Sequence, residues 1–527
     1  MPRETAHQAA QHATRAMELI QQGRLEDAIA CYDRALEIKP DYVEALNNRG
    51  NLLLALKRFD DALASYDKAL ALKPDHVRAL YNRGNALLAL GRPAAALENY
   101  DQALSLAPSH VGSRNNRGKA LLELKRLNEA LESYDEALQL DPTNVEAWCN
   151  RATCLLDMGR IEDALQAIRK ATALKPDSAD AQSNLGAVLS AAGQTTEAIA
   201  AYERAIGSAP HLAIAHMNLG FALLRDGQYQ RGWQEYEWRG LADGIPPREY
   251  PKPRWQGQPL TGKTILLYAE QGLGDAIHFA RFVTVLAGQG ARVIFAVHPP
   301  LVALMQSLSG VSQVIPLDTP PPPFDMYQSI MSVPGILGIL PTAIPAPSPY
   351  IEPDPARTAA WRARLGAQGF KIGIVWEGKG ETPMQRARST TLAHFAGIAS
   401  IDGVRLISLQ KDGDISTAVF PVENLGEAFD AGPDAFLDTA AVIRNLDLVL
   451  TIDTSVAHLA GALGAPTWVA VPFAPDWRWG DRGGTNPWYP SMRVFRQPTP
   501  ADWGSVFAGL ESAVRERLSA YVSVSGP

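Results

Sequence analysis

The stretch 451–472, TIDTSVAHLAGALGAPTWVAVP, decides the fold of the C-terminal half of the chain. The apolar run that ends at Asp453 (LDLVLTID) has the length and composition of a buried parallel strand. Short polar residues then cap a helix of small residues, which Pro466 ends before the strand TWVAV begins. The stretch therefore predicts a βαβ unit. Its strand-to-helix turn carries Asp453, Thr454, Ser455 and His458.

This turn is a suitable place for an anion. Free backbone N–H groups and the positive end of the helix dipole face any ligand in the turn, and this favours phosphate. The alternative is that Ser455 merely caps the helix and His458 packs against it. The turn alone does not decide between the two interpretations.

The composition argues against several kinds of partner. With 49 basic and 56 acidic residues the net charge is −7, so no overall basic field favours nucleic acid. No apolar stretch approaches the roughly 20 residues of a membrane-spanning helix, and the N-terminus lacks the apolar core of a signal peptide. Cys31, Cys149 and Cys154 form no CxxC pair and are expected to be buried. We expect a cytoplasmic protein without membrane insertion.

A period of 34 residues runs through the N-terminal part of the chain. It is kept by glycine (Gly50, Gly84, Gly118, Gly186, Gly220), alanine (Ala28, Ala62, Ala96, Ala130, Ala164, Ala198), tyrosine (Tyr32, Tyr66, Tyr100, Tyr134, Tyr202) and proline (Pro40, Pro74, Pro108, Pro142, Pro176, Pro210). Glycine and alanine let two helices approach closely, tyrosine fills the gap, and proline breaks the second helix. The pattern resembles tetratricopeptide repeats from residue 9 to about 240. A seventh, degenerate unit keeps Gly232 and Tyr236 in register. The resemblance implies a superhelix over residues 1–240. The segment that follows, 241–262, is rich in Pro and Gly and is expected to be a linker.

One further column consists of asparagines at the same spacing: Asn48, Asn82, Asn116, Asn150, Asn184 and Asn218. Equivalent positions stack along a superhelix, so these amides form a ladder on the inner helices. An amide donates and accepts hydrogen bonds, which suits the backbone of an extended peptide. Asparagine is also frequent in the repeat consensus, which is the alternative explanation. The ladder resembles that of eukaryotic O-GlcNAc transferase and implies a groove that binds peptide.

Strands and helices alternate after the linker. In a first half (263–355) we expect the buried strand TILLYAE, after which ARVIFAVHPPLVALM, VSQVIPL and FDMYQSI continue an alternation of strands and helices. In a second half (356–527) we expect four buried strands, KIGIVW, VRLISLQ, LDLVLTID and TWVAVP. The glycine turn at 272–275 lacks the third spaced glycine of a dinucleotide fingerprint, so an oxidoreductase is not expected. Two consecutive doubly wound sheets after a solenoid suggest the GT-B architecture of glycosyltransferases, with a cleft between the sheets.

Asp275, in GLGDAIHFAR (272–281), has two interpretations. It either caps a helix, typically worth about 1 kcal/mol, or takes a proton from an acceptor hydroxyl as a general base. The residues alone favour the cap. However, GLGDAIHFAR resembles the first-strand motif of the ADP-heptose heptosyltransferases, and this resemblance makes Asp275 the candidate base.

Further motifs extend the resemblance over nearly the whole chain. DTSVAHLAGALGAP (453–466) resembles the nucleotide-diphosphate turn of the same family, which gives Asp453, Thr454, Ser455 and His458 that role. PDWRWGDRGGTNPWYPSMRVFRQ (475–497) completes a likeness to bacterial tetratricopeptide glycosyltransferases, including those that glycosylate flagellins. Trp376 and Gln410, each at a strand end, become candidate cleft contacts.

The loop EGKGETPMQRARST (377–390) departs from the turn found in these relatives. Its Lys379 and Arg388 suit phosphate, because guanidinium and ammonium groups donate charged hydrogen bonds. The alternative is a solvated basic loop. Downstream, four aromatic residues either stack on a ligand or lock a loop between the halves: Trp477, Trp479, Trp488 and Tyr489. The segment 502–518 predicts a closing helix that crosses back over the first half.

Together these features predict a glycosyltransferase that uses a nucleotide sugar as donor substrate, and the resemblance to the heptosyltransferases implies inversion. The superhelix recruits a protein acceptor, such as flagellin, and the sugar is transferred to Ser or Thr hydroxyls. No cofactor and no metal are expected, because no carboxylate pair is placed to carry one. Two alternatives stay open. The acceptor is a glycan of the cell envelope, or the protein is a non-catalytic adaptor whose α/β region only senses nucleotide sugar.

Overall fold

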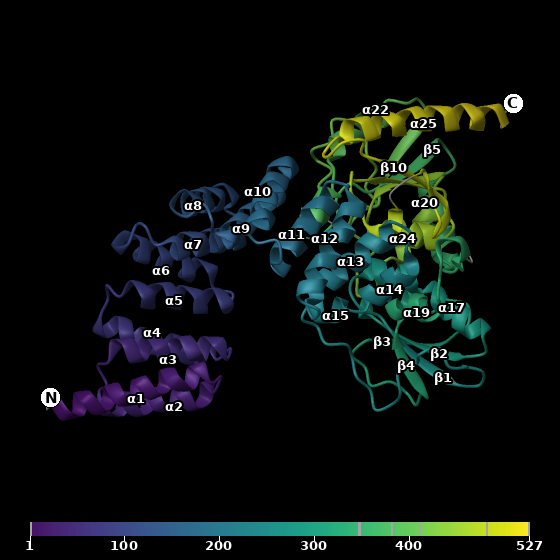
Figure 1. The fold of residues 1–527 in the computed structure, drawn as a ribbon. Helices are drawn as coiled ribbons and strands as arrows, with labels where there is room; N and C mark the ends of the chain where they lie inside the picture. Colours follow the sequence, from purple (N-terminus) through teal and green to yellow (C-terminus); the bar gives the residue numbers. More distant parts are fainter. Residues whose placement is uncertain (1–2, 346–348, 381–382, 412, 481–482, 525–527) are drawn as a thin grey trace. The chain divides into compact units, whose positions relative to one another are not determined.

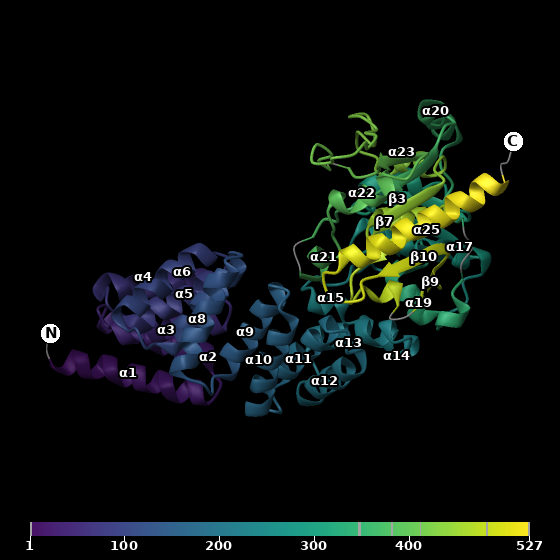
Figure 2. The same cartoon turned by 90° about the horizontal axis from the view of Figure 1, so that it is seen from above.

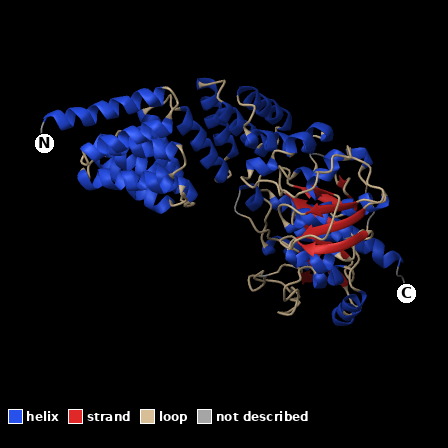
Figure 3. Ribbon diagram, turned by 90° about the horizontal axis from the view of Figure 1, so that it is seen from below, coloured by secondary structure: helices blue, strands red, loops and turns tan. Residues whose placement is uncertain are grey.

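A computed structural model describes residues 3–345, 349–380, 383–411, 413–480 and 483–524 of the 527-residue chain. The chain forms two compact units, Met1–Val188 and Leu189–Pro527. All described strands lie in the second unit, which also contains the last helices of the repeat array (Figure 3).

Pairs of antiparallel helices occupy the region of the 34-residue period (Figure 1). They are α1 (Arg3–Gln21), α2 (Leu25–Ile38), α3 (Val43–Ala55), α4 (Phe59–Leu72), α5 (Val77–Ala89), α6 (Pro93–Leu106), α7 (Val111–Glu123), α8 (Leu127–Leu140), α9 (Val145–Asp157), α10 (Ile161–Leu174), α11 (Ala179–Ala191), α12 (Thr195–Ser208), α13 (Ala213–Arg225), α14 (Tyr229–Tyr236) and the short α15 (Arg239–Ala242). A Cβ added at Gly118 would lie 2.5 Å from Cε1 of Tyr134, and Gly84 faces Tyr100 at the same distance. The glycine and tyrosine columns therefore form the close helix contacts that their spacing predicts.

A periodic arginine contact also joins the repeats, and the sequence analysis missed it. Arg49, Arg83, Arg117 and Arg151 each donate from Nε to an aspartate 16 residues earlier, at 2.6 to 2.7 Å. Nη1 of Arg117 also donates to the Ser133 hydroxyl at 2.6 Å, 16 residues later. Arg49 and Arg83 make the corresponding bonds to Ser65 and Asn99, so these three arginines each link one outer helix to the next. Ala167 stands at the corresponding position for Arg151, which among the described residues bonds only to Asp135. The columns of Arg and Asp at the repeat spacing could have revealed it.

The second unit contains two sheets of mainly parallel strands. The first has the order β3-β2-β1-β4 and the second β6-β5-β7-β8-β10-β9, with β9 antiparallel to β10. The strands are β1 (Thr264–Tyr268), β2 (Arg292–Val297), β3 (Val311–Pro316), β4 (Met326–Ser329), β5 (Phe370–Ile374), β6 (Val404–Ser408), β7 (Leu448–Ile452), β8 (Thr467–Val471), β9 (Thr485–Asn486) and β10 (Tyr489–Arg496). The five strands predicted individually are present as β1 and β5 to β8, and β2, β3 and β4 lie where an alternation of strands and helices was expected, whereas β9 and β10 were not predicted.

Helices cover both faces of the second sheet. One face packs against α20 (Pro355–Leu365), α23 (Leu437–Ile443) and α24 (Ser455–Ala462), and the other against α25 (Trp503–Val524). Figure 2 shows α25 lying across this sheet. Val506, Phe507 and Leu510 of α25 share an apolar cluster with strands of the second sheet. The expectation that this helix crosses back over the first half is therefore wrong, because its apolar face matches the sheet of its own half.

The first sheet has helices on one face. These include α16 (Leu273–Phe279) and α17 (Arg281–Gly288), whereas the loop residues Tyr250 and Phe324 pack on the opposite face. The connection before β4 contains four consecutive prolines, 320–323, which are incompatible with a helix interior. Loop side chains therefore replace the second helical layer that a doubly wound sheet would have.

The predicted linker packs closely against the first sheet. Trp255 is 1% exposed, and its backbone N–H donates to the carbonyl oxygen of Tyr327 at 2.9 Å. Trp233 and Tyr236 of the last repeat belong to the same apolar core as β1 and α24. The end of the repeat array and both sheets thus share one core.

The close contact between Gly118 and Tyr134 gives a stability prediction. Gly118→Ala should lower the free energy of unfolding by about 1–3 kcal/mol, because the added methyl overlaps the ring of Tyr134, and the thermal unfolding midpoint should fall accordingly. Gly207→Ala is the matched control. Gly207 lies in α12 with no atom within 4 Å of an added Cβ, so alanine should leave the midpoint unchanged or raise it. Equal midpoints for wild type and Gly118→Ala would contradict this account of the glycine column.

Candidate functional site

Each sheet has a point where its strand order reverses, and ligands of open α/β sheets bind beside the carboxyl ends of the strands at such points. In the second sheet the reversal lies between β5 and β7. Trp376 follows β5, and the predicted turn 453–455 follows β7. In the first sheet the reversal lies between β1 and β4, and the loop 269–272 connects β1 to α16.

The helices that start at these two points pack against each other. A Cβ added at Gly274 would lie 3.2 Å from Cδ2 of His458 and 3.4 Å from Cα of Ser455. The first turn of α16 is therefore close to the first turn of α24. Two motifs that lie far apart in the sequence, GLGDAIHFAR and DTSVAHLAGALGAP, are brought together at the carboxyl ends of both sheets.

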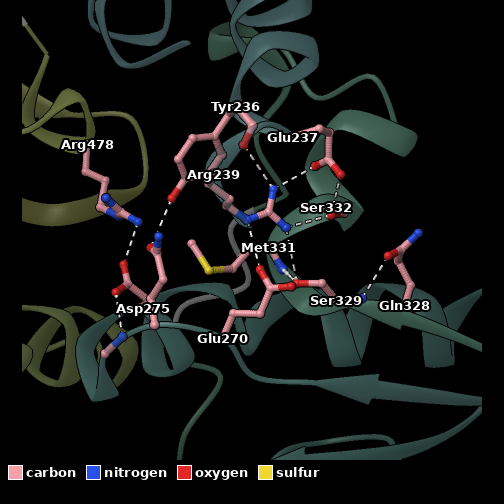
Figure 4. A network of polar contacts seen from close by, with 12 residues as sticks. Tyr236, Glu237, Arg239, Glu270, Asp275, Gln328, Ser329, Met331, Ser332 and Arg478 are labelled. Atoms are coloured by element: carbon pink, nitrogen blue, oxygen red, sulfur yellow. Dashed lines mark hydrogen bonds and ion pairs between the residues drawn. The ribbon is translucent and has the colours of Figure 1, made fainter. Parts of the chain in front are cut away.

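Asp275 is hydrogen-bonded through both carboxylate oxygens (Figure 4). Its Oδ2 accepts from the backbone N–H of Gly272 at 3.1 Å. Gly272 is the N-cap of α16 and Asp275 is the third residue of the helix, so the interpretation of Asp275 as the N-cap residue is wrong. Its Oδ1 accepts from Nη2 of Arg478 at 2.6 Å. The Asp275 side chain remains 23% exposed. It thus bonds back to the N-cap of α16 and also to Arg478 of the second half.

Arg478 is the main residue of this region that the sequence analysis missed. Its side chain is 7% exposed and pairs with Asp476 at 2.9 Å as well as with Asp275. The turn η5 (Trp477–Trp479) carries it from the second half to the first. The motif PDWRWG marked this turn, but no spacing in the sequence connects it to a residue 203 positions earlier.

Asp453 is held in an environment that disfavours its charge. Burial raises the pKa of the Asp453 carboxyl to about 6, and repulsion from Asp476 adds to this effect. Arg388, the Trp479 indole and Arg478 act in the opposite direction. A carboxyl with a pKa near 6 becomes protonated at mildly acidic pH, and in that state it repels a bound phosphate less than an ionised aspartate does.

His458 lies beneath the turn, 5% exposed. Its Nδ1 is 3.1 Å from the Tyr489 hydroxyl, which is also 2.9 Å from Nδ1 of His278. Burial lowers the pKa of both histidines well below the ordinary value, and the neighbouring arginines lower it further. His458 is therefore neutral near pH 7 and does not supply a positive charge to a phosphate.

Arg388 is the cation of the basic loop that lies near the turn. Its charge acts on both Asp453 and His458, and its Nη2 donates to the backbone carbonyl of Lys379 at 2.7 Å. Nε of Arg388 is buried and lacks a hydrogen-bond partner among the described residues. The Lys379 side chain is exposed. Residues 381–382 of this loop, and 481–482 of the tryptophan-rich motif, lie outside the described ranges.

Trp376 and Gln410 shape the start of the same loop. Trp376 is 5% exposed and packs in the core of the second sheet. Oε1 of Gln410 accepts from the backbone N–H groups of Trp376 and Glu377, at 3.3 and 3.1 Å. Both residues thus support the end of β5, and their direct contact with a ligand stays a prediction.

The four downstream aromatic residues are buried. Trp477, Trp479, Trp488 and Tyr489 are each at most 2% exposed. The Trp477 ring lies 5.2 Å from that of Trp233, and Nε1 of Trp488 donates to the Tyr229 hydroxyl at 3.2 Å. This packing agrees with the interpretation that these residues lock a loop.

The asparagine ladder bonds one repeat to the next. Nδ2 of Asn82 donates to Oδ1 of Asn47 at 3.0 Å, and Nδ2 of Asn150 donates to Oδ1 of Asn115 at 2.9 Å. Nδ2 of Asn116 donates to Oδ1 of Asn85 at 2.8 Å. The six predicted positions are all half-buried: Asn48, Asn82, Asn116, Asn150, Asn184 and Asn218. At Asn82, Asn116 and Asn150 the amide Nδ2 already donates to the preceding repeat, so peptide binding would depend on the remaining N–H and on the amide oxygen.

Two further features concern metals and membranes. Within the described ranges, no group of three or more His, Cys, Asp or Glu side chains could hold a metal ion. No helix in the same ranges is long and apolar enough to cross a membrane. Cys149 and Cys154 are buried as expected, whereas Cys31 is only partly buried.

The environment of Asp453 predicts a pH-dependent stability difference. Its folded-state pKa of about 6 lies above the ordinary 3.8, so the folded protein loses stability as pH rises through this window. Asp453→Asn removes this loss and should be more stable than wild type above pH 6, by on the order of 2 kcal/mol. The advantage should shrink toward pH 4, as measured by thermal unfolding across pH. Asp402→Asn, a change at an exposed position, should show no such trend.

Comparisons with known proteins identify the repeats. One tetratricopeptide repeat model matches residues 14–77, 81–145 and 188–237, and another matches 121–187. Protein FlbA of Caulobacter vibrioides is 29% identical over 54% of this chain and 52% of its own length, so the chain spans about half of that relative.

Solved structures of repeat proteins also resemble part of the chain. A tetratricopeptide repeat protein from Parabacteroides merdae is 18% identical and covers 46% of this chain and 95% of its own, with a TM-score of 0.40. A thermophilic repeat protein from Thermus thermophilus is 26% identical and covers 34% of this chain and 99% of its own, with a TM-score of 0.33. On the evidence of the matching models, the helical pairs that precede the two sheets are tetratricopeptide repeats.

Proposed function

We propose that this protein is a glycosyltransferase that moves a sugar from a nucleotide-sugar donor to Ser or Thr hydroxyls of a protein acceptor. The observation that carries the proposal is the packing of α16 on α24, with Gly274 against Ser455 and His458. This packing brings the candidate base, Asp275, close to the candidate phosphate turn, 453–458, at the carboxyl ends of the two sheets. We place these sheets in the GT-B class on the resemblance described above.

The donor side has the chemistry that a diphosphate needs. The Thr454 side chain does not cap α24, which leaves the first backbone N–H groups of the helix for an anion. Arg388 adds a positive charge near the turn. As the glycosidic bond breaks, the leaving diphosphate gains negative charge, and fixed donors and cations stabilise that charge.

The acceptor side needs a base for the hydroxyl proton. A carboxylate oxygen has two acceptor sites, so each oxygen of Asp275 keeps one after its bond to Gly272 or Arg478. In the proposed step the acceptor oxygen bonds to the anomeric carbon, its proton moves to Asp275, and the bond to the donor phosphate breaks. This single displacement inverts the configuration at that carbon.

The acceptor is proposed to be a polypeptide, because repeat arrays of this kind form binding grooves for protein segments. Flagellin is the first acceptor to test, on the resemblance to flagellin glycosyltransferases. A specific observation favours a second candidate, a non-catalytic adaptor. Both oxygens of Asp275 are engaged by the protein, one of them by the largely buried Arg478.

A thermal-shift screen identifies the donor. The protein is mixed with UDP-, GDP-, ADP-, dTDP- and CMP-sugars, and a ligand at 100-fold excess over Kd stabilises the fold by about 2.7 kcal/mol. Arg388→Gln should weaken the binding of the stabilising donor by roughly 10-fold or more, because it removes a charge-assisted contact. Arg386→Gln, an exposed position of the same loop, is the control and should bind normally. Equal loss in both variants, or in neither, would contradict the role of Arg388.

Asp275→Asn separates an enzyme from an adaptor. The variant should lose transfer by about 100-fold or more while its donor-induced thermal shift stays unchanged, because the amide keeps the shape but cannot take the proton. Transfer is measured with the donor from the screen and purified flagellin. Normal transfer by the variant would exclude Asp275 as the base. A wild-type protein that binds donor but glycosylates neither flagellin nor other co-purifying proteins would favour the adaptor.

A further inference from the structure

We propose that Tyr236 and Arg239, from the seventh repeat, are positioning residues for the loop that carries Asp275. The repeat array would then form part of the candidate catalytic region as well as recruiting the acceptor. The catalytic part of this statement rests on the proposed function, whereas the positioning part is a property of the fold. Figure 4 shows the contacts concerned.

Tyr236 departs from the other members of its column. In regular repeats the tyrosine ring packs over the glycine 16 residues earlier, as Tyr134 does over Gly118. At the seventh unit, the nearest atom to a Cβ added at Gly220 is the backbone N of Tyr236, at 2.8 Å. The helix backbone has thus taken the place of the ring, and the ring is free to turn elsewhere.

The Tyr236 hydroxyl uses this freedom to bond outside the repeats. It donates to Oε1 of Gln271 at 3.1 Å. Burial raises the pKa of Tyr236, so the hydroxyl keeps its proton and remains a donor. The hydroxyls of Tyr66 and Tyr100 instead donate to asparagines of their own repeats, each at 2.8 Å. One periodic position therefore has two uses in this chain.

Gln271 is a residue that needs such support. Its φ of 52° lies in the left-handed region, where a side chain other than glycine costs about 1 kcal/mol or more. The next residue, Gly272, donates its backbone N–H to Asp275. A change in the backbone at Gln271 would therefore move the group that orients the candidate base.

Arg239 holds the same loop from the adjacent side. Its guanidinium is buried, and Nε donates to Oε2 of Glu270 at 2.8 Å. Nη2 donates to the Ser332 hydroxyl at 2.8 Å, in the turn that follows β4. One side chain from the repeat array thus joins the carboxyl ends of β1 and β4, where the order of the first sheet reverses.

These contacts define a positioning role. Tyr236 and Arg239 bond to Gln271 and Glu270, and Arg478 bonds to Asp275 itself. The loop is thus held by the repeat array on one side and by the Trp477–Trp479 turn on the other. The two repeat residues act on Asp275 through the loop.

Hydrogen–deuterium exchange of the full chain without ligand tests the proposal. In Tyr236→Phe, backbone amides of residues 269–276 should exchange roughly two- to tenfold faster, as expected when one neutral hydrogen bond is lost. Tyr100→Phe is the matched control. It removes the same hydroxyl from the same column and the bond to Asn85, so it should leave residues 269–276 unchanged. Unchanged exchange in Tyr236→Phe, or equal acceleration in both variants, would overturn the proposal.

Arg239→Lys gives a second reading. Lysine keeps the charge and the aliphatic stem but lacks the fork that spans Glu270 and Ser332. Exchange should accelerate in residues 269–276 and also in 329–333. Acceleration in only one of these segments would contradict the bridging role of Arg239. If this variant fails to fold, as judged by circular dichroism, the Tyr236→Phe result decides.

Transfer kinetics connect the positioning to function. With the donor and acceptor identified, Tyr236→Phe should lower kcat several-fold and leave the KM for the donor unchanged, because the donor turn is untouched. Faster loop exchange with unchanged kcat would support the positioning and count against Asp275 as the base. Unchanged loop exchange would overturn the positioning whatever the activity, so the two failures are distinguishable.

Discussion

The aromatic contact between α14 and the Trp477–Trp479 turn is the constraint on which the second unit depends. The Trp233 and Trp477 rings meet edge to face at 5.2 Å, and Tyr229 also meets Trp477 edge to face at 6.5 Å. Such aromatic pairs stabilise the fold by more than the burial of their apolar surface alone would. Since Arg478 lies in the same turn, this contact also fixes the guanidinium that holds Asp275. Removal of the last repeat would therefore disturb the candidate site as well as the core.

Local patterns in the sequence were sufficient for most of the fold. The strands ending at Ile374 and Ile452 are continuous apolar runs, and the repeats are recognised by their period of 34 residues. β10 was missed because it interrupts its apolar positions with Pro490 and Arg493, a pattern closer to that of a loop. β10 forms by pairing with β8, which is not adjacent to it in the sequence, so no local signal indicates the strand.

The candidate site was predictable in its residue types and not in its charges. The short polar residues after β7 identified the turn, because such residues directly after a buried strand are typical of the start of a helix. Nothing local indicated that His458 would be neutral or that Asp453 would resist ionisation, since both effects come from burial between two halves of the chain. Likewise, the period placed Tyr236 in its column, but the hydrogen bond from its hydroxyl to Gln271 forms only because the last repeat packs against the first sheet.

The position of the seventh unit has a consequence for how such proteins diversify. This unit is committed to the sheets, while the repeats before Val188 bond to each other through the same arginine and asparagine contacts at successive interfaces. Whole repeats could therefore be gained or lost upstream in steps of 34 residues while the contacts of the seventh unit with the first sheet stay the same. The seventh unit would then be the constant end of an array whose number of repeats can vary.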